Sequence, residues 1–557
     1  MEVNERYRLW VEKAFSDPDL KRELQEIEGN EKEIEDRFYR ELEFGTGGLR
    51  GVIGAGTYRM NVYTVGKATQ GYSNYLKRTM QKPSVAIAYD SRIKSDVFAR
   101  AAACVFAANG IQVHLYAELM PTPSLSFAVR HLKCSGGIVI TASHNPAKYN
   151  GYKVYGSDGC QITVEAAELI LDEISKVDVF ADVKTTDFEE AVRRGNISYI
   201  DDEVINLYLD AVSECALNPK QIDKEVSIVY TPLNGAGRRC VTTCLERNGF
   251  HTITIPPEQE MPDGSFPTCP YPNPEIREAL EVGLKKAKDV GSDLLLATDP
   301  DCDRCGVAVK DGDGFTLISG NQMGVLLFDY ICKKHIENGT MPMNPIAVST
   351  IVSTKMVDRL SKTYGVEIRR VLTGFKFIGE QIGFLEQKGE ETRYIFGFEE
   401  SYGYLSGSFV RDKDAVNASL LICEMFAHYK AIGKSLLNVL NELYETYGYY
   451  MESLESLTFE GVSGFETMQR IMRDFSTCPP KEIAGRKMVQ MVNYNQGIRD
   501  LPKSNVLEFN LEGDVTVVIR PSGTEPKLKI YYLVKENSKK ACEKLIQAMK
   551  LYFADLK

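Results

Sequence analysis

The 557-residue sequence predicts an α/β protein with three tandem domains of similar topology and a smaller carboxyl-terminal α+β domain. Strand-like runs alternate with helical segments, which is typical of βαβ units with parallel strands. The same succession of signals recurs three times, at intervals much longer than those of solenoid repeats, so we interpret the copies as domains. A chain of this length also exceeds what one hydrophobic core can hold.

The first copy contains the clearest strand. Gly136 to Ile140 (GGIVI) is a short, apolar, β-branched run bounded by glycine, the pattern of a buried parallel strand. The whole copy is predicted as strand 84–89, helix 97–108, strand 111–116, helix 124–132 and strand 136–140. It ends in a polar loop that begins at Thr141.

Two further copies follow the same pattern. The second is predicted as strand 226–230, helix 237–247, strand 250–255, helix 276–288 and strand 293–297, followed by the loop 299–304. The third is predicted as strand 346–349, helix 354–363, strand 366–371, helix 377–387 and strand 393–396, followed by the loop 398–401. Each copy thus ends in a polar loop at the carboxyl end of a strand, where open α/β folds bind ligands. We expect these loops to share an active-site cleft between the domains.

The carboxyl-terminal stretch has a different pattern. Strands at 515–519 and 528–534 flank a polar loop, and a helix at 539–551 follows, which predicts a small α+β domain presenting one loop. The segment 454–502 shows no clear pattern. The predicted domains are 1–205 with the Ser143 loop, 206–322 with the loop 299–304, 323–450 with the loop 398–401, and 451–557 with the loop 520–527.

Composition argues against several kinds of partner. Hydrophobic residues make up 43% of the chain and charged residues 26%, which is ordinary for a globular protein. The net charge of -11 argues against a nucleic-acid binder, whose surface would be basic. No run approaches the length of a membrane span, and the charged start (MEVNERYRLWVEKAF) predicts an amphipathic helix, so we expect neither a signal peptide nor a membrane partner. The 13 scattered cysteines favour reduced thiols and a cytoplasmic location.

The loop Thr141-Ala-Ser-His-Asn-Pro146 places a serine directly after the strand that ends at Ile140. An adjacent histidine raises the possibility of a Ser-His hydrolase. However, neighbouring side chains on an extended loop point in opposite directions, so His144 is expected to be poorly placed to deprotonate Ser143. The G-x-S-x-G elbow of such hydrolases is also absent. The loop is therefore a candidate for chemistry other than acyl transfer, and a plain surface turn is the alternative.

Asp299-Pro-Asp-Cys-Asp-Arg304 follows an apolar run and carries carboxylates at alternating positions. A curled loop would bring Asp299, Asp301 and Asp303 onto one hard cation, and oxygen-only ligation suits Mg²⁺. An EF-hand is excluded, because the glycine and glutamate that it needs are replaced by Arg304 and Lys310. A phosphatase with Asp299 as nucleophile stays an alternative.

Two loops have the composition of anion-binding sites. Arg520-Pro-Ser-Gly-Thr-Glu-Pro-Lys527 combines a guanidinium, two hydroxyls, a glycine and an ammonium, which suits a phosphate clamp, although a hairpin turn is possible. Gly45-Thr-Gly-Gly-Leu-Arg-Gly51 follows a charged helical stretch rather than a strand, so a dinucleotide fingerprint is improbable. It could deliver Arg50 to an anion or serve as a linker.

Five motifs, GTGGLRG, TASHNP, DPDCDR, GFEES and RPSGTEPK, occur in this order across nearly the whole chain. Together they resemble the α-D-phosphohexomutase superfamily. The segments ITASHNPAKYNGYKVYGSDGCQI and EFGTGGLRG resemble its phosphoglucomutase-2-like branch, which includes bacterial phosphoglucomutases and phosphopentomutase-type enzymes. The resemblance implies four domains, three of shared α/β topology and a smaller fourth.

The resemblance also implies roles at matching positions. Ser143 is expected to carry the transferred phosphoryl group, and an oxygen of that group is expected to join Asp299, Asp301 and Asp303 around Mg²⁺. Substrate or the phosphoryl group is expected to contact several further residues: Arg50, Lys153 and Arg304 near the serine; Thr373, Gly374 and Lys376 in TGFK; Glu399 and Ser401 at the sugar; and Arg520, Ser522, Gly523, Thr524 and Lys527 at the non-reacting phosphate. The general acid or base stays open among Lys153, Lys376 and His144, because some members have a histidine where this chain has Tyr402-Gly403.

The expected activity is therefore that of a phosphoglucomutase, which interconverts glucose 1-phosphate and glucose 6-phosphate through a phosphoserine enzyme and glucose 1,6-bisphosphate. Mg²⁺ is the expected cofactor and glucose 1,6-bisphosphate the expected activator. A phosphopentomutase, a phosphomannomutase, a glucose 1,6-bisphosphate synthase or a phosphatase on the same site are the alternatives. Sugar phosphates are the expected partners, and a monomer or a homodimer is the expected state.

Overall fold

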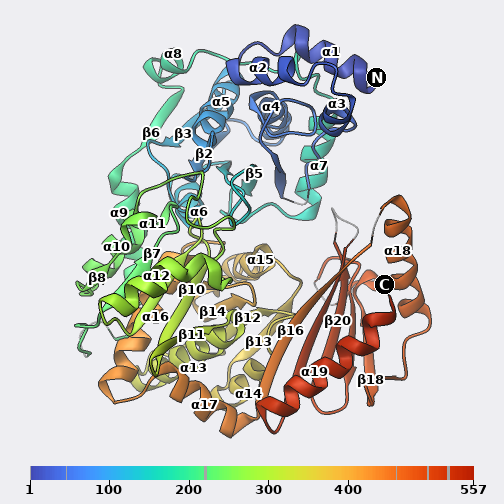
Figure 1. Cartoon of the computed structure of the whole chain (residues 1–557). Coiled ribbons are helices and arrows are strands. Elements are labelled where there is room, and N and C mark those ends of the chain that lie inside the picture. The colour runs from blue at the N-terminus through green and yellow to red at the C-terminus, as the bar shows by residue number, and fades with distance from the viewer. Residues whose placement is uncertain are drawn as a thin grey trace. The chain divides into compact units, whose positions relative to one another are not determined.

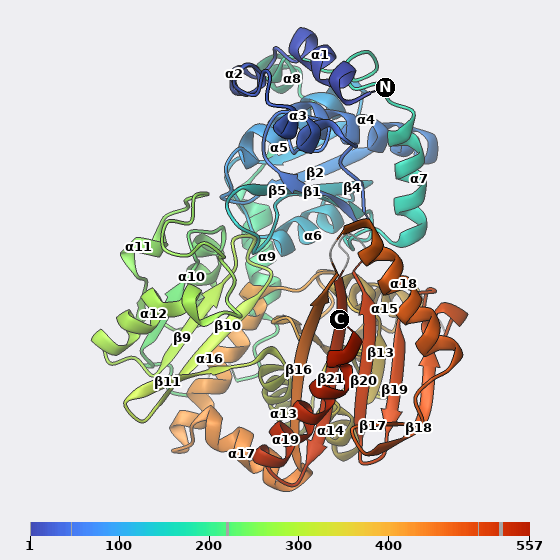
Figure 2. The same cartoon turned by 45° about the vertical axis from the view of Figure 1, so that its right-hand side comes forward.

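The computed structural model describes residues 2–45, 47–218, 222–459, 461–498, 501–522 and 527–556. These residues form two compact units. The first contains residues up to 318 together with 378–394 and 402–428, and the second contains 319–377, 395–401 and the chain from 429 onward. Figures 1 and 2 show the elements in two views.

Three short helices open the first unit: α1 (Val3–Lys13), α2 (Pro18–Glu26) and α3 (Glu31–Phe38). Their apolar faces pack around Trp10, whose side chain lies edge-on to Phe38, Tyr63 and Phe180. The helix predicted for the charged amino terminus is thus confirmed as α1.

A six-stranded sheet follows, in the order β1-β5-β4-β2-β3-β6. Its strands are β1 (Gly48–Val52), β2 (Ser84–Tyr89), β3 (Gln112–Tyr116), β4 (Gly136–Ile140), β5 (Tyr149–Gly156) and β6 (Ile197–Ile200). The pairs β6–β3, β3–β2 and β2–β4 are parallel, whereas β4–β5 and β5–β1 are antiparallel. The helices of this domain are α4 (Val62–Thr79), α5 (Ser95–Ala108), α6 (Thr122–His131), α7 (Val164–Ser175), α8 (Phe188–Arg193) and α9 (Asp202–Ser213).

Helices cover both faces of this sheet, and two glycines of β4 allow their close approach. A Cβ on Gly136 would lie 2.0 Å from the Tyr72 hydroxyl of α4, and a Cβ on Gly137 would lie 2.7 Å from Val129 of α6. Successive strand residues face opposite sides of a sheet, so α4 and α6 lie on opposite faces. Burial on both faces explains why the strand is apolar throughout.

The second sheet has the order β11-β10-β9-β7-β8. Its elements are β7 (Ile228–Thr231), α10 (Gly237–Arg247), β8 (Ile253–Thr254), α11 (Pro257–Glu260), α12 (Arg277–Asp289), β9 (Leu294–Thr298), β10 (Cys305–Asp311) and β11 (Gly314–Ile318). The order β8-β7-β9-β10 repeats β3-β2-β4-β5, with two parallel pairs and a final antiparallel pair. The strand predicted at 250–255 is reduced to Ile253–Thr254, and Pro256 and Pro257 limit its carboxyl end because proline cannot donate to a ladder.

The second unit begins with the third α/β copy, in which β12 lies between β13 and β14. The elements of this copy are α13 (Gly320–Asn338), β12 (Ile346–Thr350), α14 (Met356–Tyr364), β13 (Glu367–Val371), α15 (Phe375–Glu386), η1 (Glu391–Arg393), β14 (Tyr394–Glu399), β15 (Gly403–Leu405), α16 (Ala415–Ala431) and α17 (Leu436–Tyr447). Most of α15 and α16, together with η1 and β15, belong to the first unit by their contacts. The strand order β13-β12-β14 matches β3-β2-β4, and β12 and β13 are again parallel.

An antiparallel six-stranded sheet completes the second unit, in the order β16-β21-β20-β19-β18-β17 (Figure 2). Its elements are β16 (Tyr449–Thr458), α18 (Gly461–Thr477), β17 (Glu482–Ile483), β18 (Arg486–Asn493), η2 (Tyr494–Gln496), β19 (Leu507–Leu511), β20 (Val515–Pro521), β21 (Lys527–Glu536), α19 (Lys539–Phe553) and η3 (Ala554–Leu556). Residues of α18 and α19 share one apolar cluster with the sheet.

The predicted fold class is therefore confirmed: three similar α/β copies precede an α+β domain. The domain boundaries at 205, 322 and 450 stay predictions, as does the shared cleft. Within the ranges that the structure describes, no helix has both the length and the apolar character needed to cross a bilayer.

Candidate active site

Ser143 lies on the loop that follows β4, as predicted. The loop is at the carboxyl end of the parallel strands β2, β3 and β4, so it occupies the edge of the sheet where ligands bind. Ser143 has a φ of 52°, a left-handed backbone that is uncommon for a residue with a side chain. Its backbone N–H donates to Thr141 Oγ1 at 2.8 Å, which holds this turn in place.

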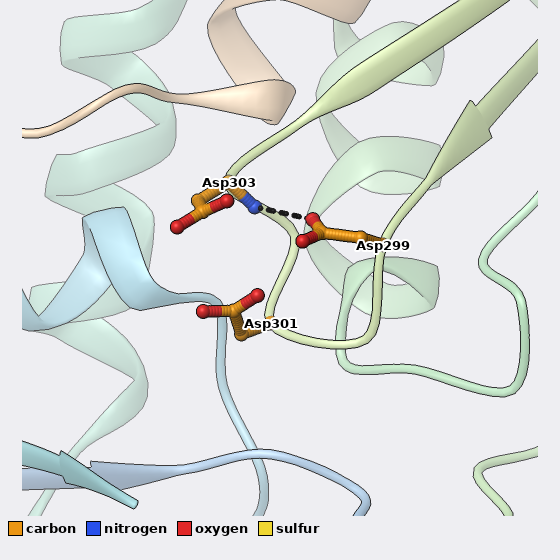
Figure 3. Close-up of side chains that lie close together, drawn as sticks. All are labelled: Asp299, Asp301 and Asp303. Carbon is orange, nitrogen blue, oxygen red and sulfur yellow. Dashed lines mark hydrogen bonds between the residues drawn. The ribbon is translucent and has the colours of Figure 1, made fainter. Parts of the chain in front are cut away.

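The three aspartates lie on the curled loop after β9 (Figure 3). Asp299 Oδ1 accepts hydrogen bonds from the backbone N–H groups of Asp303 and Arg304, each at 3.0 Å. Cys302, between the last two aspartates, has a φ of 53°. The predicted curl is therefore confirmed, and it brings one oxygen from each aspartate within 4.8 Å of the others.

The two loops meet at Ser143. Its hydroxyl donates to Asp299 Oδ2 at 2.8 Å and also lies 3.1 Å from Nδ1 of His144. The prediction that His144 is poorly placed to deprotonate Ser143 is therefore wrong as to its position. It assumed an extended loop, whereas the left-handed turn at Ser143 brings the two neighbouring side chains to the same side.

The electrostatics of His144 still differ from those of a hydrolase. Burial, together with the nearby Arg304 guanidinium, lowers the pKa of His144 to about 2, although the Asp303 carboxylate opposes the shift. In a Ser-His-acid triad, a carboxylate instead stabilises the protonated ring. The imidazole of His144 is therefore held neutral.

Two ammonium groups flank the aspartates. Lys153, on β5, lies 2.7 Å from Asp301 and 3.2 Å from Asp303. Burial opposes its charge, but these two carboxylates raise the pKa of Lys153 well above its usual value. Lys413, between β15 and α16, lies 2.9 Å from Asp303. Lys413 was not predicted, because no local sequence pattern connects it with a loop more than a hundred residues away.

Arg50 lies on β1, which pairs with β5 so that Arg50 is opposite Gly151. Its side chain is exposed and its guanidinium lies 3.4 Å from Asn145 Oδ1, on the Ser143 loop. Arg304 instead pairs with Glu275 at 2.5 Å. The first unit thus brings together every predicted residue of the serine and metal sites.

The residues present fit a divalent metal ion. Within the described ranges, Asp301 Oδ1 and Asp303 Oδ1 are buried and have no hydrogen-bond partner. Burial, with the neighbouring carboxylates Asp301 and Asp303, also raises the pKa of Asp299 well above its usual value, an electrostatic stress that a cation would relieve. This buried triad could hold a metal, and its all-oxygen donor set suits Mg²⁺.

The remaining predicted residues lie in the second unit. The Arg520 guanidinium, on β20, donates to Thr373 Oγ1, so the RPSG loop meets the TGFK loop. Gly374 has a φ of 113°, and the Lys376 ammonium lies 5.2 Å from the centre of the Phe377 ring. At the base of the clamp, the Ser522 N–H donates to the Lys527 carbonyl at 2.7 Å. Gly523 and Thr524 lie outside the described residues.

The sugar-loop residues follow β14. Glu399 is buried at the end of this strand, and Ser401 is half-buried two residues later. Between them, Glu400 accepts a hydrogen bond from Thr350 Oγ1 at 2.9 Å. Burial also raises the pKa of Tyr531, on β21, to about 12.

Known proteins match this chain along most of its length. Family models for domains I, II and III of phosphoglucomutase/phosphomannomutase match residues 41–179, 206–312 and 319–447, and the model for the carboxyl-terminal domain matches residues 478–549. The carboxyl-terminal match spans β17 to β21 and most of α19, so all four folded parts have counterparts in one family.

Relatives that match over nearly their whole length belong to the same family. A phosphoglucomutase of Staphylococcus aureus (strain bovine RF122 / ET3-1) is 37% identical over 543 residues, which covers 95% of each chain. A phosphoglucomutase of Staphylococcus saprophyticus is 34% identical over 536 residues, covering 94% of this chain and 95% of that one. The structure of a Paramecium phosphoglucomutase, pp63/parafusin, superposes with a TM-score of 0.72 at 18% identity, covering 93% and 96% of the two chains. The chain therefore belongs to the phosphoglucomutase/phosphomannomutase family, and it is an enzyme of the isomerase class that moves a phosphoryl group.

Proposed function

We propose that this enzyme is a phosphoglucomutase that interconverts α-D-glucose 1-phosphate and glucose 6-phosphate through phosphorylated Ser143. The observation that carries the proposal is the contact between the Ser143 hydroxyl and Asp299, at 2.8 Å, in a buried carboxylate triad flanked by two lysines. The relatives named phosphoglucomutase, at up to 37% identity over most of the chain, favour glucose as the sugar.

Phosphoryl transfer passes through a loose transition state, so the protein contributes mainly position and charge. Ser143 would give its phosphoryl group to the free hydroxyl of the sugar phosphate and later recover the other one. Lys153 and Arg50 would neutralise the oxygens of the group in transit, because both lie beside the serine loop or the triad. Mg²⁺ held by Asp299, Asp301 and Asp303 would supply further positive charge to these oxygens.

A proton must also leave the attacking hydroxyl. Lys153, His144 and Lys376 are the nitrogen groups proposed to take it. Of these, His144 contacts the Ser143 hydroxyl oxygen, which would be the leaving oxygen of the phosphoserine, so this contact suits proton exchange with Ser143 rather than with the sugar hydroxyl. Its lowered pKa also makes the His144 ring a weak proton acceptor, and a protonated lysine cannot accept a proton, so the choice among the three stays open.

The second unit would hold the part of the substrate that does not react. Arg520 offers planar, charged hydrogen bonds suited to a phosphate. Glu399 and Ser401 would read sugar hydroxyls, and the mutase reaction would present the 1-position and then the 6-position to Ser143. The proposed phosphate and substrate contacts are completed by Arg304, Thr373, Gly374, Ser522, Gly523, Thr524 and Lys527.

The test is a coupled assay for glucose 6-phosphate formation from glucose 1-phosphate, with and without glucose 1,6-bisphosphate. The proposal predicts turnover that the bisphosphate stimulates, because it phosphorylates any Ser143 that has lost its group. Release of inorganic phosphate as the main product would instead indicate a phosphatase. Accumulation of the bisphosphate from another phosphoryl donor would indicate a synthase.

Substrate preference is expected to follow the hydroxyls that Glu399 and Ser401 would contact. If these are the hydroxyls at positions 3 and 4, glucose and mannose share them, whereas galactose differs at position 4. A mispaired buried polar group costs about 1–3 kcal/mol, so we expect kcat/KM to fall from glucose 1-phosphate to mannose 1-phosphate and to be lowest for galactose 1-phosphate. Including ribose 1-phosphate completes the comparison, since a clear preference for it would make the enzyme a phosphopentomutase.

Arg520→Gln is expected to raise the KM for glucose 1-phosphate. Losing a charged hydrogen bond costs about 1.5–3 kcal/mol, which corresponds to roughly a 10- to 150-fold change. The matched control is Arg486→Gln, because Arg486 belongs to the same domain but pairs with Glu536. An unchanged KM in Arg520→Gln, measured by steady-state kinetics, would remove Arg520 from the proposed clamp.

A further inference from the structure

Arg92 is a buried arginine that binds the backbone of the Ser143 loop. Its side chain is 0% exposed. One terminal nitrogen donates to the carbonyls of Ser143 and Asn145, and the other donates to those of Pro146 and Tyr149, both at 3.0 Å. One guanidinium therefore binds three carbonyls of the Ser143 loop and the carbonyl of Tyr149, the first residue of β5.

This arrangement requires arginine. A guanidinium offers five donors in a rigid plane, whereas a lysine offers one compact ammonium that cannot span four acceptors. The loop also needs an external constraint, because the left-handed backbone at Ser143 is unfavourable by itself. Fixing the carbonyl of Ser143 fixes the peptide plane that orients its hydroxyl.

Asp90 fixes the backbone N–H of Ser143 through Thr141. Thr141 Oγ1 donates to Asp90 Oδ2 at 2.6 Å and accepts the N–H of Ser143. Asp90 also accepts the backbone N–H of Arg92 at 2.9 Å, and its carboxylate lies 3.4 Å from the Arg92 guanidinium. Both the N–H and the C=O of Ser143 are thus bound within one buried network.

The network reaches into the domain that carries the aspartates. The Arg92 guanidinium lies 5.1 Å from the centre of the Phe266 ring, within the range of a cation–π contact. The Arg92 backbone also forms a bridge with Gly264, and a Cβ on Gly264 would lie only 2.4 Å from the backbone of Ile93. Phe266 and Gly264 belong to residues 261–276, the segment between α11 and α12, which we name the strap.

The other end of the strap contacts the aspartate loop, which carries Asp299, Asp301 and Asp303. Glu275 pairs with Arg304 at 2.5 Å, and Arg304 directly follows the triad. The carbonyl of Pro274 packs against Gly306 of β10, where a Cβ would lie 2.5 Å away. The strap therefore contacts Arg92, which binds the serine loop. It also contacts Arg304 at the end of the aspartate loop and Gly306 at the start of β10.

We infer that Arg92 is a positioning residue which, with Phe266 of the strap, sets the Ser143 hydroxyl against the aspartate triad. The inference rests on the proposed function, since it assigns a mechanical role to the loop that would carry the phosphoryl group. Among the described residues, Arg92 bonds to backbone carbonyls of the Ser143 loop and not to the Ser143 hydroxyl. Its loss is therefore expected to act on the rate of transfer and not on substrate affinity.

The experiment compares Arg92→Lys, Phe266→Leu and the double variant with a matched control, Arg59→Lys. Arg59 is also buried and donates to backbone carbonyls, at 3.0 Å to Tyr58 and 3.3 Å to Asp36, but it lies outside the serine loop. For each protein we would measure Tm, kcat and KM for glucose 1-phosphate. Intact-mass spectrometry would give the rate and final extent of Ser143 phosphorylation by glucose 1,6-bisphosphate.

Arg92→Lys is expected to lower kcat and the phosphorylation rate together, on the order of 100-fold, because small misplacements of reacting groups have effects of this size. KM and the final phosphoserine content should stay close to those of the wild type. Phe266→Leu should cause a smaller loss in the same direction, and the double variant should lose less than the product of the two single effects. Arg59→Lys should lower Tm without lowering kcat.

Two other results are distinguishable. If wild-type Ser143 is phosphorylated but Arg92→Lys transfers at the wild-type rate, or if Arg92→Lys and Arg59→Lys lose kcat equally, the positioning role is wrong and the proposed function stands. If wild-type Ser143 takes no phosphoryl group, the proposed function fails and the inference fails with it.

Discussion

Ser143→Ala is expected to lower kcat on the order of 10⁴- to 10⁶-fold, as loss of a covalent nucleophile does in other enzymes. The Ser143 hydroxyl occupies the point where the serine loop and the aspartate loop meet, 2.8 Å from Asp299. Within the proposed mechanism, no neighbouring group replaces it as the phosphoryl carrier. The coupled glucose 6-phosphate assay measures the loss directly.

A serine elsewhere in the same domain gives the control. Ser175 lies at the exposed end of α7, where its hydroxyl donates to the Asp172 carbonyl. Ser175→Ala is expected to retain the wild-type kcat. If Ser143→Ala kept a comparable rate while folding normally, the covalent mechanism would be abandoned.

Asp301→Asn is expected to lower kcat on the order of 10²- to 10³-fold, the range seen when one preorganised electrostatic group is removed. Asp301 is fully buried, and its Oδ2 accepts from Thr122 at 2.9 Å and from Lys153 at 2.7 Å. Its Oδ1 is buried without a hydrogen-bond partner in the described part of the chain, which leaves it available to a cation. Asparagine has nearly the same shape but removes the negative charge.

The measurement is kcat against Mg²⁺ concentration after removal of metal with a chelator. The wild type should lose turnover in the chelator and recover it with Mg²⁺, and Asp301→Asn should need more Mg²⁺ and reach a lower plateau. Asp311→Asn is the control, because Asp311 is an exposed residue of β10 that accepts a hydrogen bond from Thr316. Full wild-type turnover in excess chelator would contradict a metal role for the triad.

The positions of Ser143 and of the three aspartates could be predicted from the sequence, because both loops directly follow a strand. Ser143 after β4 and the aspartates after β9 needed only an apolar run, a strand end and alternating carboxylates, all of which are local. The strand order of each domain could not be derived in this way. It depends on which strands pair, and the antiparallel strand β5 was missed because its Asn150-Gly151 pair reads as a turn.

The structure explains that exception. Asn150 is buried within β5, and its side chain donates to the Ile93 carbonyl and to Ser95 Oγ. Gly151 is needed for close packing, since a Cβ there would lie 2.5 Å from the Thr141 carbonyl. A turn-like pair can therefore form a strand when tertiary contacts satisfy it, and this strand carries Lys153.

Residues that tertiary contacts bring to the site were also missed. Lys413 reaches Asp303 from the segment before α16, and Arg92 reaches the serine loop from beyond the end of β2. Neither Lys413 nor Arg92 belongs to a sequence motif that would indicate which residues it contacts. The misplacement of His144 has a different cause, because it depended on one backbone angle that the sequence does not reveal.

The central claim is that a phosphoryl group on Ser143 passes to the sugar. The most direct test is a single turnover in which the enzyme, labelled at Ser143 with a radioactive phosphoryl group, is mixed with unlabelled glucose 1-phosphate. The account predicts that the label leaves the protein and appears first in glucose 1,6-bisphosphate. Label that stays on the protein, or that appears first as inorganic phosphate, would contradict it.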